Sequence, residues 1–224
     1  MDYTSHDVVA KIRSRFKLPK VGHGGTLDPQ ATGLLVLLLG KGTKLSQFVM
    51  GSDKVYEGTM RLGVETSTQD MEGEVIRESD PSAVTRAMLE AEFAKLTGDL
   101  MQMPPMVSAI KKNGVPLYKL ARKGETIERE PRPVHVFEFR LKEFDPPVCS
   151  FLLHCTKGTY VRTICHDIGQ ALGCGCAMET LRRTSSGKMT LEKAVTMDVL
   201  DGLTREDLVD YIIPLAKAQV EFEL

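Results

Sequence analysis

The chain has 224 residues, of which 42% are hydrophobic and 26% are charged, and its formal net charge is −1. This composition is that of a soluble globular protein, and the length is sufficient for a sizeable core. No apolar run reaches the roughly 20 residues that a membrane helix needs. The opening residues do not have the pattern of a secretory signal, so none is expected.

Charge is distributed unevenly along the chain. Residues 11–27 contain five Lys or Arg and no acid, and residues 111–142 contain nine Lys or Arg and four Glu. Acidic residues dominate 65–99 and 192–224. This pattern is compatible with one positive face that meets a polyanion, or with a solvated mixed surface, and charge alone does not separate the two.

The cysteines indicate reduced thiols in a cytosol-like compartment, because their number is odd and their spacing is irregular. His154 and His166 lie near them in the sequence, but no Cys-x-x-Cys occurs and Cys174-Gly-Cys176 is too tight for a zinc knuckle. We therefore expect small buried thiols rather than a metal site. The five are Cys149, Cys155, Cys165, Cys174 and Cys176.

The first half of the chain predicts a helix, a loop, a buried run and a strand, in that order. Thr4 to Asp7 forms a capping box, and apolar residues at helical spacing follow it until Pro19. The aliphatic run 34–39 is predicted to be buried core, and a short helix is predicted around 43–50. Residues 54–63 alternate as a half-buried strand does, and 66–73 are a polar loop. The inner face of that strand is predicted to carry Tyr56, Gly58, Met60 and Leu62.

The second half predicts a helix over 81–96 that Gly98 stops, with Val84, Met88, Ala91 and Phe93 as its apolar stripe. The proline-rich residues 101–133 are predicted to form an inserted, partly extended arm. Strands are predicted over 134–144 and 148–156, joined by a turn at 145–147, and a helix closed by Gly173 follows Gly158-Thr159. This order of elements predicts an α+β fold with a mixed or largely antiparallel sheet.

The loop at 21–33, VGHGGTLDPQATG, presents a single carboxylate, Asp28. It lacks the last glycine of a dinucleotide fingerprint, and no Gly-Lys-Ser/Thr follows, so a nucleotide cradle is not predicted. Gly24 and Gly25 allow positive φ angles, and Pro29 keeps Asp28 out of the helical region. A lone Asp in a loop is most often a turn residue or a cap, so the loop needs further context.

Four blocks in the same order give this chain a resemblance to the TruB family of pseudouridine synthases. The first is the loop itself, whose Gly-x-Leu-Asp-Pro pattern carries the family's catalytic Asp. The second, residues 53–73, is similar to a Lys-x-Tyr strand and the polar loop after it. The third resembles an inserted thumb and the fourth an Arg-bearing helix with the next strand. Their sequences are VGHGGTLDPQATGLL, DKVYEGTMRLGVETSTQDMEG, QMPPMVSAIKKNGVPLYKLARKGETIERE and KGTYVRTICHDIGQALGCGCAMETLRRTSSG.

The resemblance implies a role for each matching residue. Asp28 is the catalytic carboxylate, acting as nucleophile or as the base that starts elimination on the sugar. Arg162 keeps that carboxylate ionised and oriented, and Tyr56 stacks on the flipped uracil. From the residues alone, Arg162 at a helix start needs a nearby anion, and Tyr56 could equally be a core residue. Further positions implied around the site are His23, Leu181, Asp70 and Tyr160.

The implied reaction converts uridine 55 in the T-loop of tRNA to pseudouridine, and it implies no cofactor and no metal. Basic residues would hold the RNA through its phosphates, which position it without reading sequence. They include the helix residues 11–17 and a set of single positions: Lys20, Lys111, Lys112, Lys119, Arg122 and Lys123.

The expected organisation is a single catalytic domain over 1–224, with a thumb at about 101–133 and an acidic C-terminal segment at 188–224. The family's usual N-terminal strand before TSHDVV is not found, and no match to an RNA-binding PUA domain is expected. We therefore expect a monomer that works without a guide RNA, in the cytoplasm or in an organelle. Gly24 stands where many bacterial members have Thr.

Two other functions remain compatible with the sequence. A non-catalytic RNA-binding or RNA-folding protein could use the same scaffold, although every matched catalytic position is filled. A small-molecule enzyme with Asp28 as its base would leave the basic thumb unexplained.

Overall fold

The computed structural model describes residues 3–221 except 109, 113, 122, 123 and 126. It divides into two compact units. The terminal unit comprises Met1–Tyr56 and Arg182–Leu224, and the central unit comprises Glu57–Leu181. Two strands, β4 (Lys54–Leu62) and β12 (Cys176–Ser186), contribute residues to both.

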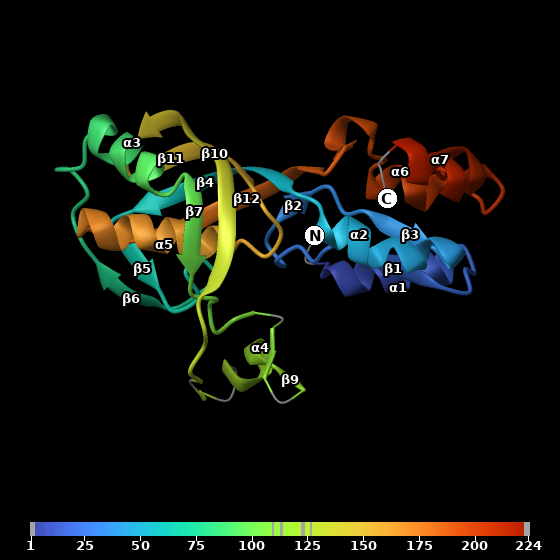
Figure 1. Cartoon of the computed structure of the whole chain (residues 1–224), viewed down its shortest axis with the longest axis horizontal. Coiled ribbons are helices and arrows are strands. Elements are labelled where there is room, and N and C mark those ends of the chain that lie inside the picture. Colours follow the sequence, from blue (N-terminus) through green and yellow to red (C-terminus); the bar gives the residue numbers. More distant parts are fainter. Residues whose placement is uncertain (1–2, 109, 113, 122–123, 126, 222–224) are drawn as a thin grey trace. The chain divides into compact units, whose positions relative to one another are not determined.

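The terminal unit begins with helix α1 (Ser5–Arg15) (Figure 1). The predicted capping box is confirmed, because the Thr4 N–H donates to Asp7 Oδ2 at 2.9 Å and the Asp7 N–H donates to Thr4 Oγ1 at 3.2 Å. The helix ends before it reaches Pro19. Lys17 has a φ of 48°, and the Leu18 N–H closes the last turn on the Arg13 carbonyl at 2.9 Å.

Short strands follow α1: β1 (Val21–His23), β2 (Thr32–Gly33) and β3 (Leu37–Leu39). β1 and β3 pair antiparallel, while β2 pairs parallel with β12. The predicted short helix is found as η1 (Gly40–Leu45) and α2 (Ser46–Gly51). The run 34–39 is less buried than predicted, since only Leu34 and Leu38 are buried and the run lines a cavity of about 730 Å³.

Part of the acidic C-terminal segment packs on α1 within the terminal unit. It contains β13 (Met189–Thr190), η2 (Leu191–Lys193), α6 (Met197–Gly202), η3 (Asp207–Tyr211) and α7 (Leu215–Glu221). A core of Ile12, Phe16, Leu200 and Leu208 joins the segment to α1. Burial of these side chains supplies the hydrophobic free energy that holds the segment in place.

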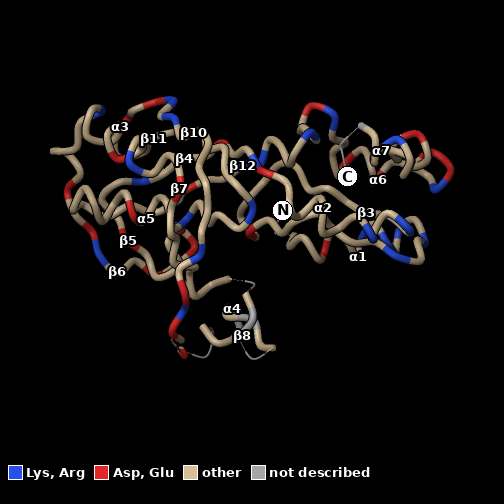
Figure 2. Tube along the Cα trace, viewed as in Figure 1, with Lys and Arg blue, Asp and Glu red and all other residues tan. Residues whose placement is uncertain are grey.

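Basic residues colour parts of α1 blue in Figure 2. Two α1 cations predicted to contact phosphate, Arg15 and Lys11, have partners inside this unit. Arg15 donates to the carbonyls of Leu200 and Leu203, both at 3.0 Å, and to that of Asp201, so it caps the end of α6. Lys11 Nζ lies 2.7 Å from Asp201 Oδ2. Arg15 and Lys11 therefore make hydrogen bonds or ion pairs within the protein, in addition to any contact with phosphate.

The central unit is built on the strand order β12-β4-β11-β10-β7. β7 spans Gly98–Gln102, β10 spans Arg132–Asp145 and β11 spans Val148–Cys155, which confirms the predicted strand pair and its turn. A hairpin of β5 (Val64–Thr66) and β6 (Val75–Glu78) flanks the polar loop 66–73. The predicted α+β fold with a mixed sheet is confirmed.

Helices α3 (Arg86–Lys95) and α5 (Val161–Leu172) pack together, and α3 also packs on β10 (Figure 1). α5 confirms its prediction, with Gly173 at a φ of 76° as its left-handed cap. The predicted stripe of α3 is wrong in part. Leu89 and Phe93 are its buried pair, and Met88 is 42% exposed. Phe93 stacks on Phe139 of β10 at 3.8 Å between centroids, and this contact selects the buried face.

The inserted arm, predicted to be partly extended, contains β8 (Lys111–Lys112), β9 (Val115–Pro116) and α4 (Leu117–Ala121). β8 and β9 pair antiparallel. Among the described helices, none is long and apolar enough to cross a membrane. All five cysteines are free and buried, as predicted.

Candidate active site

Asp28 lies half-buried on the loop between β1 and β2 of the terminal unit. The loop leaves β1 through Gly24, whose N–H donates to the Val36 carbonyl at 2.8 Å. Beyond Asp28 the Ala31 N–H donates to the Asp28 carbonyl at 2.9 Å and closes a turn. The carboxylate is therefore carried on backbone that is bonded before and after it.

Gly24 is required by packing in this chain. A Cβ at position 24 would overlap Val49, which is 1% exposed and β-branched, so it has little freedom to move aside. Val49 therefore fills the space that a Thr side chain at position 24 would need, and glycine is the residue that fits there.

His23, at the end of β1, is half-buried and accepts a hydrogen bond at Nδ1 from the Gly25 N–H, at 3.3 Å. Burial is the main cause that lowers the pKa of His23, and the neighbouring Arg183 and His6 charges lower it further. The neutral ring, with Nδ1 as acceptor, suits a role in shaping the loop next to Asp28.

Two residues that sequence analysis did not select hold the Asp28 loop within the terminal unit. Ser5 of α1 is hydrogen-bonded to both backbone polar groups of Leu27. Arg183 of β12 donates to carbonyl oxygens on both sides of Asp28. Tyr56 is half-buried on β4, as its predicted strand face requires, next to the unit boundary.

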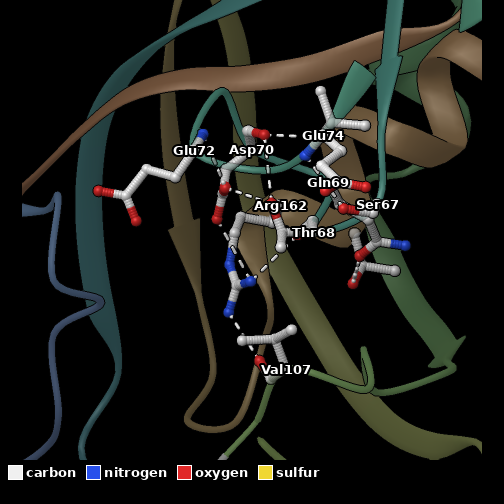
Figure 3. Close-up of polar contacts among 10 residues, drawn as sticks. Ser67, Thr68, Gln69, Asp70, Glu72, Glu74, Val107 and Arg162 are labelled. Carbon is white, nitrogen blue, oxygen red and sulfur yellow. Dashed lines mark hydrogen bonds and ion pairs between the residues drawn. The ribbon is translucent and has the colours of Figure 1, made fainter. Parts of the chain in front are cut away.

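In the central unit, Arg162 stands in the first turn of α5 and is 4% exposed (Figure 3). Its Nη1 lies 3.3 Å from Asp70 Oδ2 and donates to the Thr68 carbonyl at 3.1 Å, and its Nη2 donates to the Val107 carbonyl at 3.0 Å. A cation at the positive end of a helix is unfavourable by itself. Asp70 supplies the anion that sequence analysis expected near it.

Asp70 is held rigidly by its own loop (Figure 3). Its Oδ1 accepts from Thr68 Oγ1 at 2.5 Å and from the Glu72 N–H at 3.2 Å, and its carbonyl accepts from Thr66 Oγ1 at 2.6 Å. The loop is also bonded to β12, where the Met71 N–H donates to the Met178 carbonyl at 3.0 Å. The guanidinium of Arg162 is thus oriented by a carboxylate that cannot easily move.

Tyr160 and Leu181 occupy different surroundings in the central unit. Tyr160 is the N-cap residue of α5, and its backbone is bonded to the buried Gln102 side chain, with the Tyr160 N–H donating at 2.7 Å and the Gln102 amide at 3.1 Å. Sequence analysis missed Gln102. Leu181 is buried at 6% exposure.

The structure assigns the candidate residues to two groups. Asp28, His23 and Tyr56 belong to the terminal unit. Arg162, Asp70, Tyr160 and Leu181 belong to the central unit, where Arg162 contacts Asp70. The pairing of Asp28 with Arg162 stays a prediction. Of the RNA-binding candidates, Lys20 is exposed, Lys111 and Lys112 form β8, and Lys119 lies in α4. Arg122 and Lys123 lie outside the described residues.

Three or more His, Cys, Asp or Glu side chains that could hold a metal ion together are not found among the described residues. The candidate side chains Asp28, Arg162 and Tyr56 contribute a carboxylate, a guanidinium and a phenol.

Comparison with known proteins accounts for nearly the whole chain. The model of the TruB family pseudouridylate synthase N-terminal domain matches residues 13–161, and that of the tRNA pseudouridylate synthase B C-terminal domain matches 162–218. The second match includes most of the acidic segment that sequence analysis left unassigned.

Two relatives are both named tRNA pseudouridine synthase B. The protein from Opitutus terrae is 50% identical over 216 residues, which are 96% of this chain and 90% of that protein. The protein from Syntrophotalea carbinolica is 47% identical over 219 residues, which are 98% of this chain and 72% of that protein.

Solved structures agree on the fold. A Cbf5-Nop10-Gar1 complex matches with a TM-score of 0.73 and 30% identity over 96% of this chain. An H/ACA RNP bound to a substrate RNA containing 2′-deoxyuridine matches with a TM-score of 0.64 and 26% identity over 99% of this chain. The present chain covers 58% and 52% of those two chains, which is less than two thirds of each. The chain belongs to the TruB family of pseudouridylate synthases.

Proposed function

We propose that this chain isomerises uridine 55 in the T-loop of tRNA to pseudouridine, with Asp28 as its catalytic carboxylate. In this reaction the bond from C1′ of the ribose to N1 of the uracil breaks, and C1′ is rejoined to C5. The C5 proton leaves and N1 takes up a proton, so the reaction needs neither an oxidant nor a group donor. A single positioned carboxylate suffices, as nucleophile at C1′ or as the base that starts elimination on the sugar.

The observation that carries the proposal is the setting of Asp28. In a chain of this family, its carboxylate stands on a loop hydrogen-bonded on both sides, at Gly24 and at Ala31. A fixed loop holds the reacting atom in place before substrate arrives, so less entropy is lost when the reaction begins.

Arg162 and Tyr56 are proposed to complete the site. The guanidinium of Arg162, oriented by Asp70, is proposed to face Asp28 and keep it ionised. Tyr56 is proposed to stack on the flipped uracil and to assist the late removal of the C5 proton. His23, Tyr160 and Leu181 are proposed to line or support the pocket.

The substrate is proposed to bind mainly through its phosphates, at Lys20 and at the thumb residues Lys111, Lys112, Lys119, Arg122 and Lys123. We also propose that the chain works as a monomer in the cytoplasm or an organelle, without a guide RNA. Activity of the purified chain on an isolated stem-loop, at the elution volume of a monomer, would support this. A requirement for an added RNA would contradict it.

The test measures release of tritium from C5-labelled uridine in an unmodified T-loop stem-loop. The parent chain is compared with Asp28→Asn and with Glu78→Gln, a matched control that neutralises an exposed carboxylate on β6. Release by the parent and the control, with none by Asp28→Asn, is the expected result.

Two other outcomes would change the assignment. Equal release by the parent and by Asp28→Asn would show that this carboxylate is not the catalyst. Tight binding of the stem-loop without release by either would favour the non-catalytic RNA-binding function.

A further inference from the structure

The Arg183 side chain is one of the largest fully buried side chains of the protein, with 1% exposure. It points its guanidinium at the loop that carries Asp28, within the terminal unit. Nε donates to the Leu34 carbonyl at 2.8 Å, Nη2 to the Gly25 carbonyl at 3.1 Å and Nη1 to the Thr26 carbonyl at 3.3 Å. One planar group thereby bonds three backbone oxygens at once.

These three oxygens lie on the two flanks of Asp28. Gly25 and Thr26 precede it, and Leu34 follows it, so the guanidinium joins the beginning of the loop to its end. The backbone of Arg183 strengthens the same junction, since its carbonyl accepts from the Leu34 N–H at 2.8 Å. Gly33 makes this approach possible, because its φ is 94° and a Cβ there would overlap the Arg183 backbone.

The cost of burying this group indicates that it does more than fill space. A charge taken out of water is expensive unless hydrogen bonds compensate it, and an apolar side chain of similar volume would avoid that cost. The hydrogen bonds of Arg183 go to neutral carbonyl oxygens of the loop. The geometry also requires arginine, because a lysine is a point charge on a flexible stem and cannot present a fork of donors.

We propose that Arg183 is a positioning residue, whose guanidinium joins the two flanks of the loop and thereby sets the position of the Asp28 carboxylate. This role rests on the proposed function, because it acts through Asp28. Arg183 is assigned no contact with the RNA, so its loss should affect the rate of the chemical step and leave RNA binding intact. A misplacement of about 1 Å at a reacting group can cost about 100-fold in rate.

The test uses Arg183→Lys and Arg183→Met, with Arg182→Lys as the matched control. Arg182 is the exposed neighbour on the same strand, and the control makes the same chemical change. Three quantities are measured for each variant: kcat and KM for tritium release from the stem-loop, the midpoint of thermal unfolding, and hydrogen exchange along the chain.

The expected result for Arg183→Met is a loss of kcat of about 100-fold or more, with KM changed by no more than about threefold. Arg183→Lys should recover only part of that loss, since it can reach fewer of the three carbonyls. Faster hydrogen exchange should be confined to the loop and to β12 where it meets β2. Arg182→Lys should match the parent in all three measurements.

Three results would overturn the proposal. Arg183→Lys with the activity of the parent would show that the fork is not needed. A rise in KM without a fall in kcat would indicate an RNA contact. Faster exchange throughout the terminal unit, with a collapsed unfolding midpoint in both variants, would assign Arg183 to general stability. An inactive parent chain would instead contradict the proposed function, so the two failures are distinguishable.

Discussion

Ser5 and Leu27 exchange hydrogen bonds between the first turn of α1 and the loop that carries Asp28. The Leu27 N–H donates to Ser5 Oγ at 2.9 Å, and the Ser5 hydroxyl lies within 3.4 Å of the Leu27 carbonyl, to which it donates. Ser5 is 5% exposed, so both bonds are shielded from water. Because Leu27 directly precedes Asp28 in the sequence, the start of α1 fixes the backbone beside the carboxylate.

Replacing Ser5 by Ala should destabilise the protein by about 1–3 kcal/mol, since a buried N–H loses its acceptor. The same change should lower kcat for tritium release and leave KM unchanged, because it loosens the loop and not the RNA contacts. Ser14→Ala, at an exposed position of the same helix, is the control and should behave as the parent does. If Ser5→Ala retained the stability and kcat of the parent, the bond to Leu27 would have no such role.

Asp70→Ala should be more damaging than Asp70→Asn. Both variants leave the Arg162 guanidinium without its carboxylate partner, and breaking a buried ion pair costs about 3–5 kcal/mol. Asn keeps an oxygen that can accept from Thr68 and from the Glu72 N–H. The chain has no Trp, so urea unfolding is best followed by far-ultraviolet circular dichroism. Equal stability of the two variants would show that the hydrogen bonds from Thr68 and from the Glu72 N–H, which only Asn can keep, contribute nothing.

Local patterns in the sequence identify several elements of this fold correctly. Alternation predicts β4, Gly173 predicts the end of α5, and a proline turn predicts the pairing of β10 with β11. Each of these signals lies within one element or one turn. The buried face of α3 could not be predicted in the same way, because the ring of Phe139 on another strand determines it.

In the candidate site, too, contacts between residues far apart in the sequence could not be predicted from local patterns. Matching motifs name Asp28, Asp70 and Arg162, since these residues lie inside the recognised blocks. The motifs do not reveal which other residues hold Asp28, Asp70 and Arg162 in position. Arg183 bonds to carbonyls 149–158 positions away, and Ser5 bonds to a residue 22 positions away. A backbone oxygen carries no side-chain signature, so partnerships of this kind become visible only once the chain is folded.

Variants of Lys20 and Arg15 should show which basic residues near the N-terminus contact RNA and which make contacts within the protein. Lys20 is exposed, and if it contacts a phosphate, Lys20→Gln should reduce the slope of log affinity against log salt by about 0.7–0.9. Arg15→Gln should leave that slope unchanged and lower the unfolding midpoint, because the side chain caps α6. Stem-loop binding at several salt concentrations checks both. A smaller slope for Arg15→Gln than for Lys20→Gln would reverse the assignment.

The buried thiols should resist alkylation in the native protein. Burial raises the pKa of Cys149, Cys165 and Cys176, so little of the reactive thiolate exists near neutral pH. Iodoacetamide at pH 8 should label the native chain slowly and modify all five cysteines once urea unfolds it. Mass spectrometry of the intact protein counts the added groups. Rapid labelling of any cysteine under native conditions would contradict the burial of that thiol.

The His23 ring should make the protein less stable as the pH falls below about 6.5. Burial lowers the pKa of His23 in the folded state below its ordinary value of 6.5, with smaller contributions from the charges of Arg183 and His6. Between the lowered folded value and 6.5, the unfolded chain binds the proton more readily than the folded chain does. Acid therefore favours unfolding in that window, and above it the ring is neutral in both states and has no effect.

His23→Gln removes the titrating group, so the variant should lose less stability than the parent over that window. Unfolding midpoints measured from pH 5 to pH 8 give the comparison. The difference between the parent and the variant should be constant above about pH 7.5 and should change only as the pH falls through 6.5. A constant difference over the whole range would mean that the ring titrates alike in the folded and unfolded chains.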